Sequence, residues 1–292
     1  MATFLTYNAV GNREDLSDII TNISPTDTPL YSMFGRTKAD ATYHEWLEDE
    51  LAAPGANKAV EGAEYTIGTV TARTRKGNYT QIFTKGYGVS GTQEAVKKAG
   101  IKSEIAYQMQ KAMKEIARDV EYAIVNNVSA VAGDASTPRE MGGIQAFVTT
   151  NVLDNGGTPR DLTEDLLNDG IQAAWEAGGS PDVVVCSGKQ KRVISSFTAG
   201  TTKTIDAEDK RLIASIDVYE SDFGVVRIVP SRYLSSSVVF VLEKGRWKVA
   251  YLRPFKQDEK AKTGDKIEKV IIGELTLEAR AEKANAIIKD LQ

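Results

Sequence analysis

The sequence contains very few of the side chains from which enzymes build reactive centres. Among 292 residues there is one histidine, His44, and one cysteine, Cys186. A zinc site of Cys and His ligands needs several such side chains and a disulfide needs two cysteines, so a single chain can form neither. Any Ser–His–Asp or Cys–His catalysis would have to depend on His44 alone. Composition therefore excludes most familiar enzyme sites.

Long apolar runs and an excess of positive charge are also missing. The longest apolar runs, at 183–186 and 238–242, are far shorter than the roughly 20 residues that a membrane-spanning helix needs. Residues 1–10 lack the features of a signal peptide, so we expect no membrane association and synthesis in a reducing cytoplasm. The 36 Lys and Arg against 40 Asp and Glu leave a net charge of −4, which argues against binding duplex DNA through bulk charge.

What is present is the composition of an ordinary folded protein, with 41% hydrophobic and 26% charged residues. The length favours two domains or one elaborated domain. Residues 1–40 have the character of an arm. Apolar residues at 16, 19, 20 and 23 predict one short helix, and the prolines at 25 and 29 then favour extended backbone.

A small apolar group follows these prolines without a periodic element around it. It comprises Leu30, Tyr31, Met33 and Phe34. These side chains either pack within their own domain, which is the commoner outcome, or pack on a neighbouring chain. For the second case, Tyr31 and Phe34 are the candidate inter-subunit contacts.

Residues 41–90 are expected to be extended. Alternation predicts a strand at 65–73 and another at 81–89, with Lys76-Gly77-Asn78 as the turn between them. The segment has few large apolar side chains, and a long ribbon with little core of its own is marginally stable alone. We therefore expect it to lie against something else.

Charges of opposite sign are separated along this ribbon. Residues 45–64 hold six acids and one lysine, whereas residues 73–85 hold four bases and no acid. One interpretation is a solvated hairpin of mixed charge. The other is a pair of complementary patches that dock one copy onto the next, since charge complementarity sets register and partner choice. The candidate contacts in the second case are Glu48, Asp49, Glu50, Arg73, Arg75 and Lys76.

Residues 92–128 show the strongest helical periodicity. Apolar residues recur at spacings of three or four, at 101, 105, 109, 113, 116, 120, 124 and 128. With Thr92 as cap, this pattern predicts one helix that runs about 42 Å from 101 to 128. The apolar stripe drifts around the helix, so we expect the two ends to pack on different neighbours and Met109 and Met113 to lie in the core.

The second half of the chain has an α/β pattern. Helices are predicted at 161–177, 189–197 and 281–291, and strands at 182–186, 213–219, 225–229, 238–242, 247–252 and 270–277. The residues 187–190 (SGKQ) lack the first glycine and the Ser or Thr of a phosphate loop, so they predict a strand-to-helix turn. The tripeptide 222–224 (DFG) has no accompanying kinase motif and is a hairpin turn.

The remaining candidate residues give little support for catalysis. Cys186 ends an apolar strand, as a small buried hydrophobe would, and His44 lies in an extended stretch that favours a surface or interface role. Asp161, Glu164 and Asp165 are typical of a first helical turn. We predict a protein that is not an enzyme and has no cofactor or metal, and we keep a hydrolase using paired carboxylates as a remote alternative.

Five stretches carry a resemblance to a known family. They are 11–18 (GNREDLSD), 24–29 (SPTDTP), 41–46 (ATYHEW), 263–265 (TGD) and 273–278 (GELTLE). Together with the order of arm, extended loop, long helix and α/β region, they resemble the HK97-type major capsid proteins of tailed bacteriophages. The local sequence is most similar to the SU10-like major head proteins.

This resemblance implies an α+β capsid fold with a specific division of the chain. Residues 1–40 would be the N-terminal arm and 41–90 the extended loop. Residues 91–150 with 250–292 would form the peripheral domain with the spine helix, and 151–249 the axial domain.

The resemblance also implies a function and partners. Copies of the chain would form hexamers and pentamers of an icosahedral head that encloses double-stranded DNA without reading its sequence. The chain would be made in the host bacterial cytoplasm, and scaffolding, portal and decoration proteins are candidate partners. An encapsulin-like compartment enclosing cargo is the alternative that keeps the fold.

Overall fold

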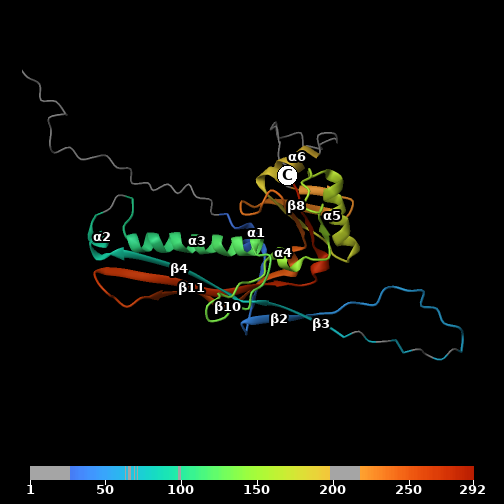
Figure 1. The fold of residues 1–292 in the computed structure, drawn as a ribbon, viewed down its shortest axis with the longest axis horizontal. Coiled ribbons are helices and arrows are strands. Elements are labelled where there is room, and N and C mark those ends of the chain that lie inside the picture. The colour runs from blue at the N-terminus through green and yellow to red at the C-terminus, as the bar shows by residue number, and fades with distance from the viewer. Residues whose placement is uncertain are drawn as a thin grey trace, which may run out of the picture.

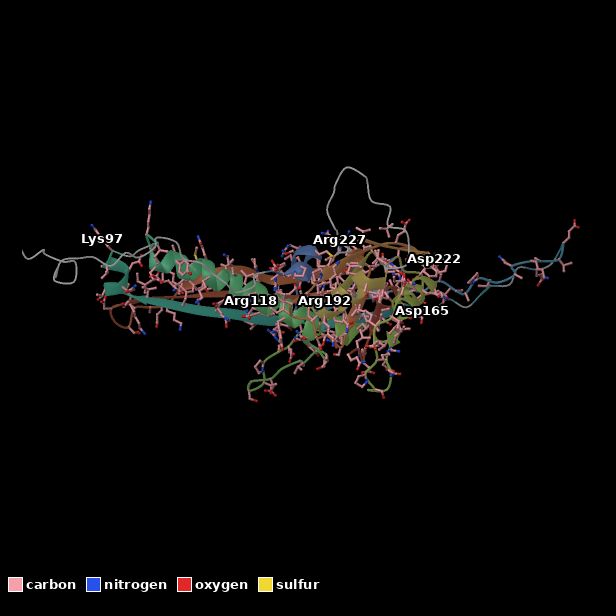
Figure 2. All side chains as sticks on the ribbon, turned by 90° about the horizontal axis from the view of Figure 1, so that it is seen from above. Lys97, Arg118, Asp165, Arg192, Asp222 and Arg227 are labelled. Atoms are coloured by element: carbon pink, nitrogen blue, oxygen red, sulfur yellow. The ribbon has the colours of Figure 1, made fainter. Side chains whose placement is uncertain are left out.

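The computed structural model describes residues 27–62, 64, 67, 68, 70, 72–97, 100–197 and 218–292. Figure 1 shows an elongated arrangement in which one long helix lies along a sheet, a more compact group of helices and strands stands at one end, and a loop projects beyond it. In the view from above, Lys97 lies near one end of the long axis, and Asp165 and Asp222 lie on the side of the projecting loop (Figure 2).

Among the described residues, the helices are α1 (Pro29–Met33), α2 (Gly91–Ala95), α3 (Glu104–Asn126), α4 (Ile144–Phe147), α5 (Glu164–Glu176) and α6 (Gly188–Phe197), with 3-10 turns η3 (Lys244–Arg246) and η4 (Glu282–Ala284). The strands are β1 (Gly35–Lys38), β2 (Tyr43–Glu48), β3 (Thr74–Tyr79), β4 (Gln81–Ser90), β5 (Val152–Leu153), β6 (Val183–Cys186), β7 (Val218–Ser221), β8 (Gly224–Pro230), β9 (Val239–Leu242), β10 (Trp247–Glu259), β11 (Lys266–Ala279) and β12 (Ala286–Ile288). The predicted arm helix at 16–23 and residues 213–217 of one predicted strand lie outside the described residues.

A four-stranded sheet supports the long helix. Its strand order is β1-β10-β11-β4, and β10 and β11 form a long antiparallel hairpin whose turn contains the predicted 263–265. Helix α3 packs mainly on β4 and also on β11. Ile116, Val120 and Ile124 of α3 are buried in the same core cluster as Leu275 and Leu277 of β11. This half of the fold is therefore one helix on one sheet.

The predicted single helix over 92–128 is wrong in its first part, because the chain breaks between α2 and α3. Gly100 adopts φ +78, in the left-handed region that glycine enters without steric cost. Ser90 caps α2 and Ser103 caps α3, in place of the predicted Thr92. Glu94 also accepts hydrogen bonds from the N–H groups of Glu104 and Ile105, which stabilises the start of α3.

The expected burial of two methionines is also wrong. Met109 and Met113 are 36% and 47% exposed, whereas Ala112 and Ile116 are buried. A helix that packs on one sheet buries one stripe of its surface. In the N-terminal half of α3 the apolar residues lie outside that buried stripe, so the two methionines face outward.

A six-stranded sheet forms the second half of the fold, in the order β5-β12-β9-β6-β8-β7. The predicted strand at 182–186, helix at 189–197 and hairpin around 222–224 are confirmed as β6, α6 and β7–β8. Helix α5 begins at Glu164 because Thr163 is its N-cap, and it is followed by Gly178 at φ +87. Asp161 therefore precedes the helix instead of lying in its first turn.

Central strands of this sheet are covered on both faces. Side chains of β6, β9 and β12 alternate between two core clusters, because successive residues of a strand point to opposite faces. Ile287 joins the cluster that contains α3, and Ile288 joins the cluster that contains α5. The sheet thus separates the two cores of the subunit.

The predicted C-terminal helix at 281–291 is wrong. That segment forms η4 and then β12, which pairs with β5 on one side and β9 on the other. Spacings of three and four suggested a helix, but Ala286, Ile287 and Ile288 are all fully buried, as a central strand requires. Asn285 positions the strand, since its Oδ1 accepts from the Trp247 indole N–H (2.9 Å) and the Glu243 amide (3.0 Å).

The predicted strand at 65–73 and turn at 76–78 are also corrected. Ile67 and Arg73 lie outside strands, while Tyr65, Thr69 and Thr71 lie outside the described residues. Gly77 and Asn78 belong to β3, which pairs with β2. The Asn78 amide is buried and exchanges hydrogen bonds with the backbone of Gly142, which aligns this part of the chain as a strand.

Candidate inter-subunit surfaces

The segment after the prolines packs mainly into its own chain. Leu30 is fully buried and Phe34 is 3% exposed, with the Phe34 ring stacked on Trp247 at 5.8 Å between centroids. Phe34 thus packs within its own subunit, the commoner of the two outcomes considered for this segment, and its contact with a neighbouring subunit stays a prediction. The sheet edge at β1 and the end of α3 supply the apolar partners that the sequence pattern did not reveal.

Tyr31 is only half-buried. Its hydroxyl lies 2.6 Å from the Tyr251 hydroxyl, and the Arg36 guanidinium lies 4.8 Å from the Tyr31 ring centre. Burial raises the pKa of Tyr251 above its usual range, so this phenol stays a neutral partner of Arg36 at physiological pH.

The charged candidates lie together at the stem of the loop, where β2 runs antiparallel to β3. Arg73 pairs with Asp49 (3.4 Å), Arg75 with Glu45 (3.7 Å), and Lys283 with Glu50 (2.5 Å). Because the chain reverses in the loop, its acidic leg and its basic leg face one another within one molecule. The first of the two interpretations, a hairpin of mixed charge, thus describes the structure within one chain.

Other polar contacts fix the base of the stem. Glu48 Oε1 accepts a hydrogen bond from the Ala281 amide (2.9 Å) and from the Trp46 indole N–H (3.3 Å). Lys76 lies on β3 opposite Trp46. The Glu50 carboxylate also raises the pKa of the Lys283 ammonium. These exposed ion pairs contribute little to stability individually, typically about 0–1 kcal/mol.

Beyond the stem, the loop carries apolar side chains into solvent. Leu51, Val60, Ile67 and Val70 are between 81% and 99% exposed. Figure 1 shows the loop between β2 and β3 reaching well away from the rest of the subunit. Exposed apolar patches are typical of interaction surfaces.

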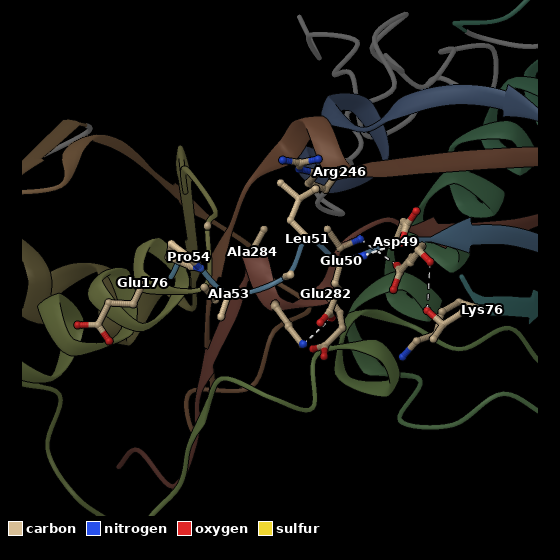
Figure 3. Close-up of a pocket in the computed structure, with 17 residues that line it drawn as sticks. Asp49, Glu50, Leu51, Ala53, Pro54, Lys76, Glu176, Arg246, Glu282 and Ala284 are labelled. Atoms are coloured by element: carbon tan, nitrogen blue, oxygen red, sulfur yellow. Dashed lines mark hydrogen bonds and ion pairs between the residues drawn. The ribbon is translucent and has the colours of Figure 1, made fainter. Parts of the chain in front are cut away.

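A cavity of about 1160 Å³ opens where the loop leaves the body. Its lining combines the stem residues Glu50 and Leu51 with Glu176 at the end of α5, Arg246 of η3, and Ala284 of η4. In Figure 3, Leu51 lies beside Arg246, and Pro54 lies toward Glu176. The walls thus come from both halves of the fold.

The single histidine and the single cysteine are both largely enclosed by the rest of the subunit. His44 Nε2 lies 3.2 Å from Glu278 Oε2, and the two side chains are 16% and 2% exposed, so His44 is less exposed than its sequence context suggested. Cys186 is buried as predicted, and burial raises the pKa of its thiol to about 12. A thiol with such a pKa is a poor nucleophile at neutral pH.

Sequence reasoning missed a set of buried carboxylates that join segments distant in the chain. Glu274 accepts from Arg139 (2.6 Å), Arg253 (2.9 Å) and Thr80 (2.7 Å). The other members are Glu121, Glu278 and Glu282. The alternation of Glu274 and Glu278 with Leu275 and Leu277 on β11 was the available signal, because it places both acids on one face of a strand whose other face is apolar, and acids on a buried strand need partners.

The described residues contain neither a metal-binding cluster nor a membrane-spanning helix. Across those ranges, no group of three or more His, Cys, Asp or Glu side chains is arranged to hold a metal ion. Within the same part of the chain, no helix has both the length and the apolar character needed to cross a bilayer.

The chain has the HK97-type fold, which it shares with several solved capsid structures. The capsid of cyanophage A-1(L) is similar with a TM-score of 0.72 and 11% identity, covering 98% of both chains. The capsid of a native GTA particle has a TM-score of 0.67 at 10% identity, covering 98% of both chains. An encapsulin from Synechococcus elongatus has a TM-score of 0.61 at 11% identity, covering 97% of this chain and 93% of that one.

Sequence comparison then identifies the family. The model of the SU10 major capsid protein family matches residues 2–292, and the chain belongs to this family. The major capsid protein of Escherichia phage Phieco32 is 25% identical over 337 aligned positions, covering 98% of this chain and 96% of the relative. The predicted fold and the predicted function as a phage major capsid protein are thereby confirmed.

Proposed function

We propose that copies of this chain assemble into hexamers and pentamers of an icosahedral head around double-stranded DNA, with the loop at 49–73 lying on a neighbouring subunit. The observation that carries this proposal is the exposure of Leu51, Ile67 and Val70, each above 90%. These side chains contact no core of their own subunit. A neighbouring copy that covered them would gain about 25 cal/mol for each Å² of apolar surface buried.

The proposed division of the chain follows the expected map. Residues 1–40 form the arm, 41–90 the extended loop, 91–150 with 250–292 the peripheral domain, and 151–249 the axial domain. Two strands link these regions, since β4 lies in the same sheet as β10 and β11, and β12 lies in the same sheet as β6.

The role is structural, without catalysis, and the other partners follow from it. Scaffolding, portal and decoration proteins would bind the shell, and the host bacterial cytoplasm would be the place of synthesis. A net charge of −4 suits a wall that encloses DNA without gripping it, because tight binding depends on neutralising many phosphates.

The assembly state of the purified chain tests this proposal. Size exclusion and negative-stain microscopy should show shells, rings or tubes, alone or on co-expression with neighbouring head genes. A variant in which residues 52–70 are replaced by a short Gly-Ser linker should keep the circular dichroism of the folded subunit but remain unassembled. Normal shells from that variant would contradict the role of the loop.

The encapsulin alternative retains one supporting observation, the similarity to the encapsulin from Synechococcus elongatus. The contents of particles isolated from infected cells distinguish the two roles. Nuclease-protected double-stranded DNA is expected for a phage head, whereas a protein cargo without DNA would support the compartment.

A further inference from the structure

A carboxylate in the interior of the subunit holds the last part of the proposed arm, at Leu30 and Tyr31. Glu121 lies on α3 and is fully buried. Its Oε1 accepts a hydrogen bond from the Leu30 amide (3.1 Å), and its Oε2 accepts one from the Tyr31 amide (2.7 Å). Both amides belong to the first turn of α1, where backbone N–H groups have no partner within the helix. One side chain of α3 thus supplies acceptors for two donors about ninety residues earlier in the chain.

Several cations on or beside the elements around α3 have other partners. Lys85 of β4 pairs with Glu115 and Asp119 on α3, and Arg139 and Arg253 both pair with Glu274 of β11. Helix α4 has no titratable side chain. The remaining titratable groups on the packed elements are Glu94 of α2, Tyr31 of α1, Tyr87 of β4, Lys266, Glu268, Lys269 and Glu278 of β11, and Glu104, Tyr107, Lys111, Lys114, Arg118 and Tyr122 of α3 itself. Within the described part of the chain, no lysine or arginine forms an ion pair with Glu121.

A buried carboxylate with these surroundings has two opposing preferences. The ionised form can accept both amide hydrogen bonds, but its charge is out of water and has no paired cation among the described residues to offset it. The protonated form loses the desolvation cost but also loses acceptor capacity at one oxygen. Burial is the larger of these effects and raises the pKa of Glu121 to about 7, although the two amides lower it.

We propose that Glu121 is a proton-sensitive latch between α3 and the chain at α1, closed more firmly in acid than at neutral pH. Opening the latch would expose Glu121 to water and release the first turn of α1 from the helix. Most of the proposed arm precedes α1 in the sequence, so the latch would govern how firmly the C-terminal part of the arm is attached to the subunit. The proposal concerns the single subunit and does not depend on the contacts assigned to the loop.

The direction of the pH effect follows from linkage. The carboxyl has a pKa near 4.5 when open to water and about 7 when the latch is closed, so the closed state binds more protons between these values. Its stabilisation is complete below pH 4.5 and is lost as pH rises through 7. These two pKa values correspond to a rise of about 40-fold in the opening equilibrium from pH 5 to pH 7, with little further change above about pH 8.

Amide hydrogen exchange of the full-length, unassembled chain measures this opening. The probes are the Leu30 and Tyr31 amides, compared between wild type and Glu121→Gln from pH 5 to pH 8. After correction for intrinsic exchange, opening in the wild type should rise about 40-fold between pH 5 and pH 7, and opening in the variant should stay constant. Glu115→Gln removes an exposed carboxylate from the same helix and should behave as wild type. Equal pH dependence in wild type and Glu121→Gln would overturn the proposal.

A second measurement needs no variant. The carboxyl carbon of Glu121 can be titrated by ¹³C NMR in the wild-type chain. A midpoint near pH 7 supports the latch, and a midpoint below pH 5 would overturn it even if Glu121→Gln did not fold.

Discussion

Two neighbouring segments of the N-terminal third, 29–48 and 49–73, have similar sequence character but opposite structural outcomes. The first contains a small apolar group without a periodic element around it, and the second has few large apolar side chains, so neither predicts a core of its own. In the first, Leu30, Phe34 and Trp46 are buried in the core of the subunit. In the second, Leu51 and Ile67 are almost fully exposed. The difference arises from partners elsewhere in the chain, because β1 joins the edge of β10 whereas the described part of the loop pairs with no strand.

The comparison suggests that single-subunit stability and assembly depend on different segments. Residues 29–48 should determine how stable the folded subunit is. The loop should leave that stability unchanged and determine whether subunits associate. Four sets of substitutions test this division, in order of decreasing effect on stability, and a charge swap accompanies the third.

The largest loss of stability is expected for Phe34→Ala. This change removes a buried ring stacked on Trp247 and leaves a cavity, which typically costs about 3–5 kcal/mol. The free energy of unfolding from urea titration measures it. A loss below about 1 kcal/mol would show that the segment is only loosely attached to the core.

Gly77→Ala should have an intermediate effect on the stem. A Cβ at Gly77 would lie 2.7 Å from the Tyr43 ring across the β2–β3 pair, so the ring or the strand must shift. Such overpacking costs about 1–3 kcal/mol. Gly55→Ala is the matched control, since a Cβ at Gly55 would meet no atom within 4 Å, and its melting temperature should be unchanged.

Reversal of the basic leg, with Arg73, Arg75 and Lys76 all changed to Glu, should cost about 1 kcal/mol or less in stability and reduce assembly. The reversed charges would face Asp49 and Glu45 within the stem and push its two legs apart. Particle yield by sedimentation measures the effect.

A charge swap separates pairing within the chain from docking between copies. The double change Arg73→Glu and Asp49→Arg keeps an ion pair at this position of the stem, with the two charges exchanged. Recovery of particle yield would support pairing within the chain, whereas yield that stays low would favour docking of these charges on a neighbouring subunit.

The smallest effect on stability is expected when Leu51, Val60, Ile67 and Val70 are all changed to Ser. Exposed side chains contribute little to the folded state, so the free energy of unfolding should change by less than about 0.5 kcal/mol. Shell assembly should nevertheless fail. Unimpaired shells with an unchanged midpoint of unfolding would show that the loop makes no essential contact between subunits.

Elements with local causes were predictable, and elements with distant causes were not. The strand at 182–186 and the hairpin around 222–224 follow from a short apolar run and a turn. The segment 286–288 is as apolar as the buried face of a helix. It forms a strand because it lies between β5 and β9 and pairs with both of them. Its pairing partners lie about 45 and 135 residues away in the sequence, beyond the reach of periodicity.

The candidate contacts show the same division. The opposite charges of the two loop legs were visible as composition, but only the antiparallel pairing of β2 with β3 brings Arg75 to Glu45 in the same chain. Glu121 gave no signal at all, since a glutamate on an otherwise amphipathic helix ordinarily faces water. Its burial depends on where α1 crosses α3.

The order of residues was enough to predict a phage head protein and to leave a single histidine and a single cysteine for any catalysis, because motif order and missing residue types are properties of the chain as written. Which apolar side chains lie inside, which charges meet, and which glutamate is shut away from water were settled only when distant segments packed together. Burial and pairing are relations between surfaces, and those surfaces exist only in the folded subunit.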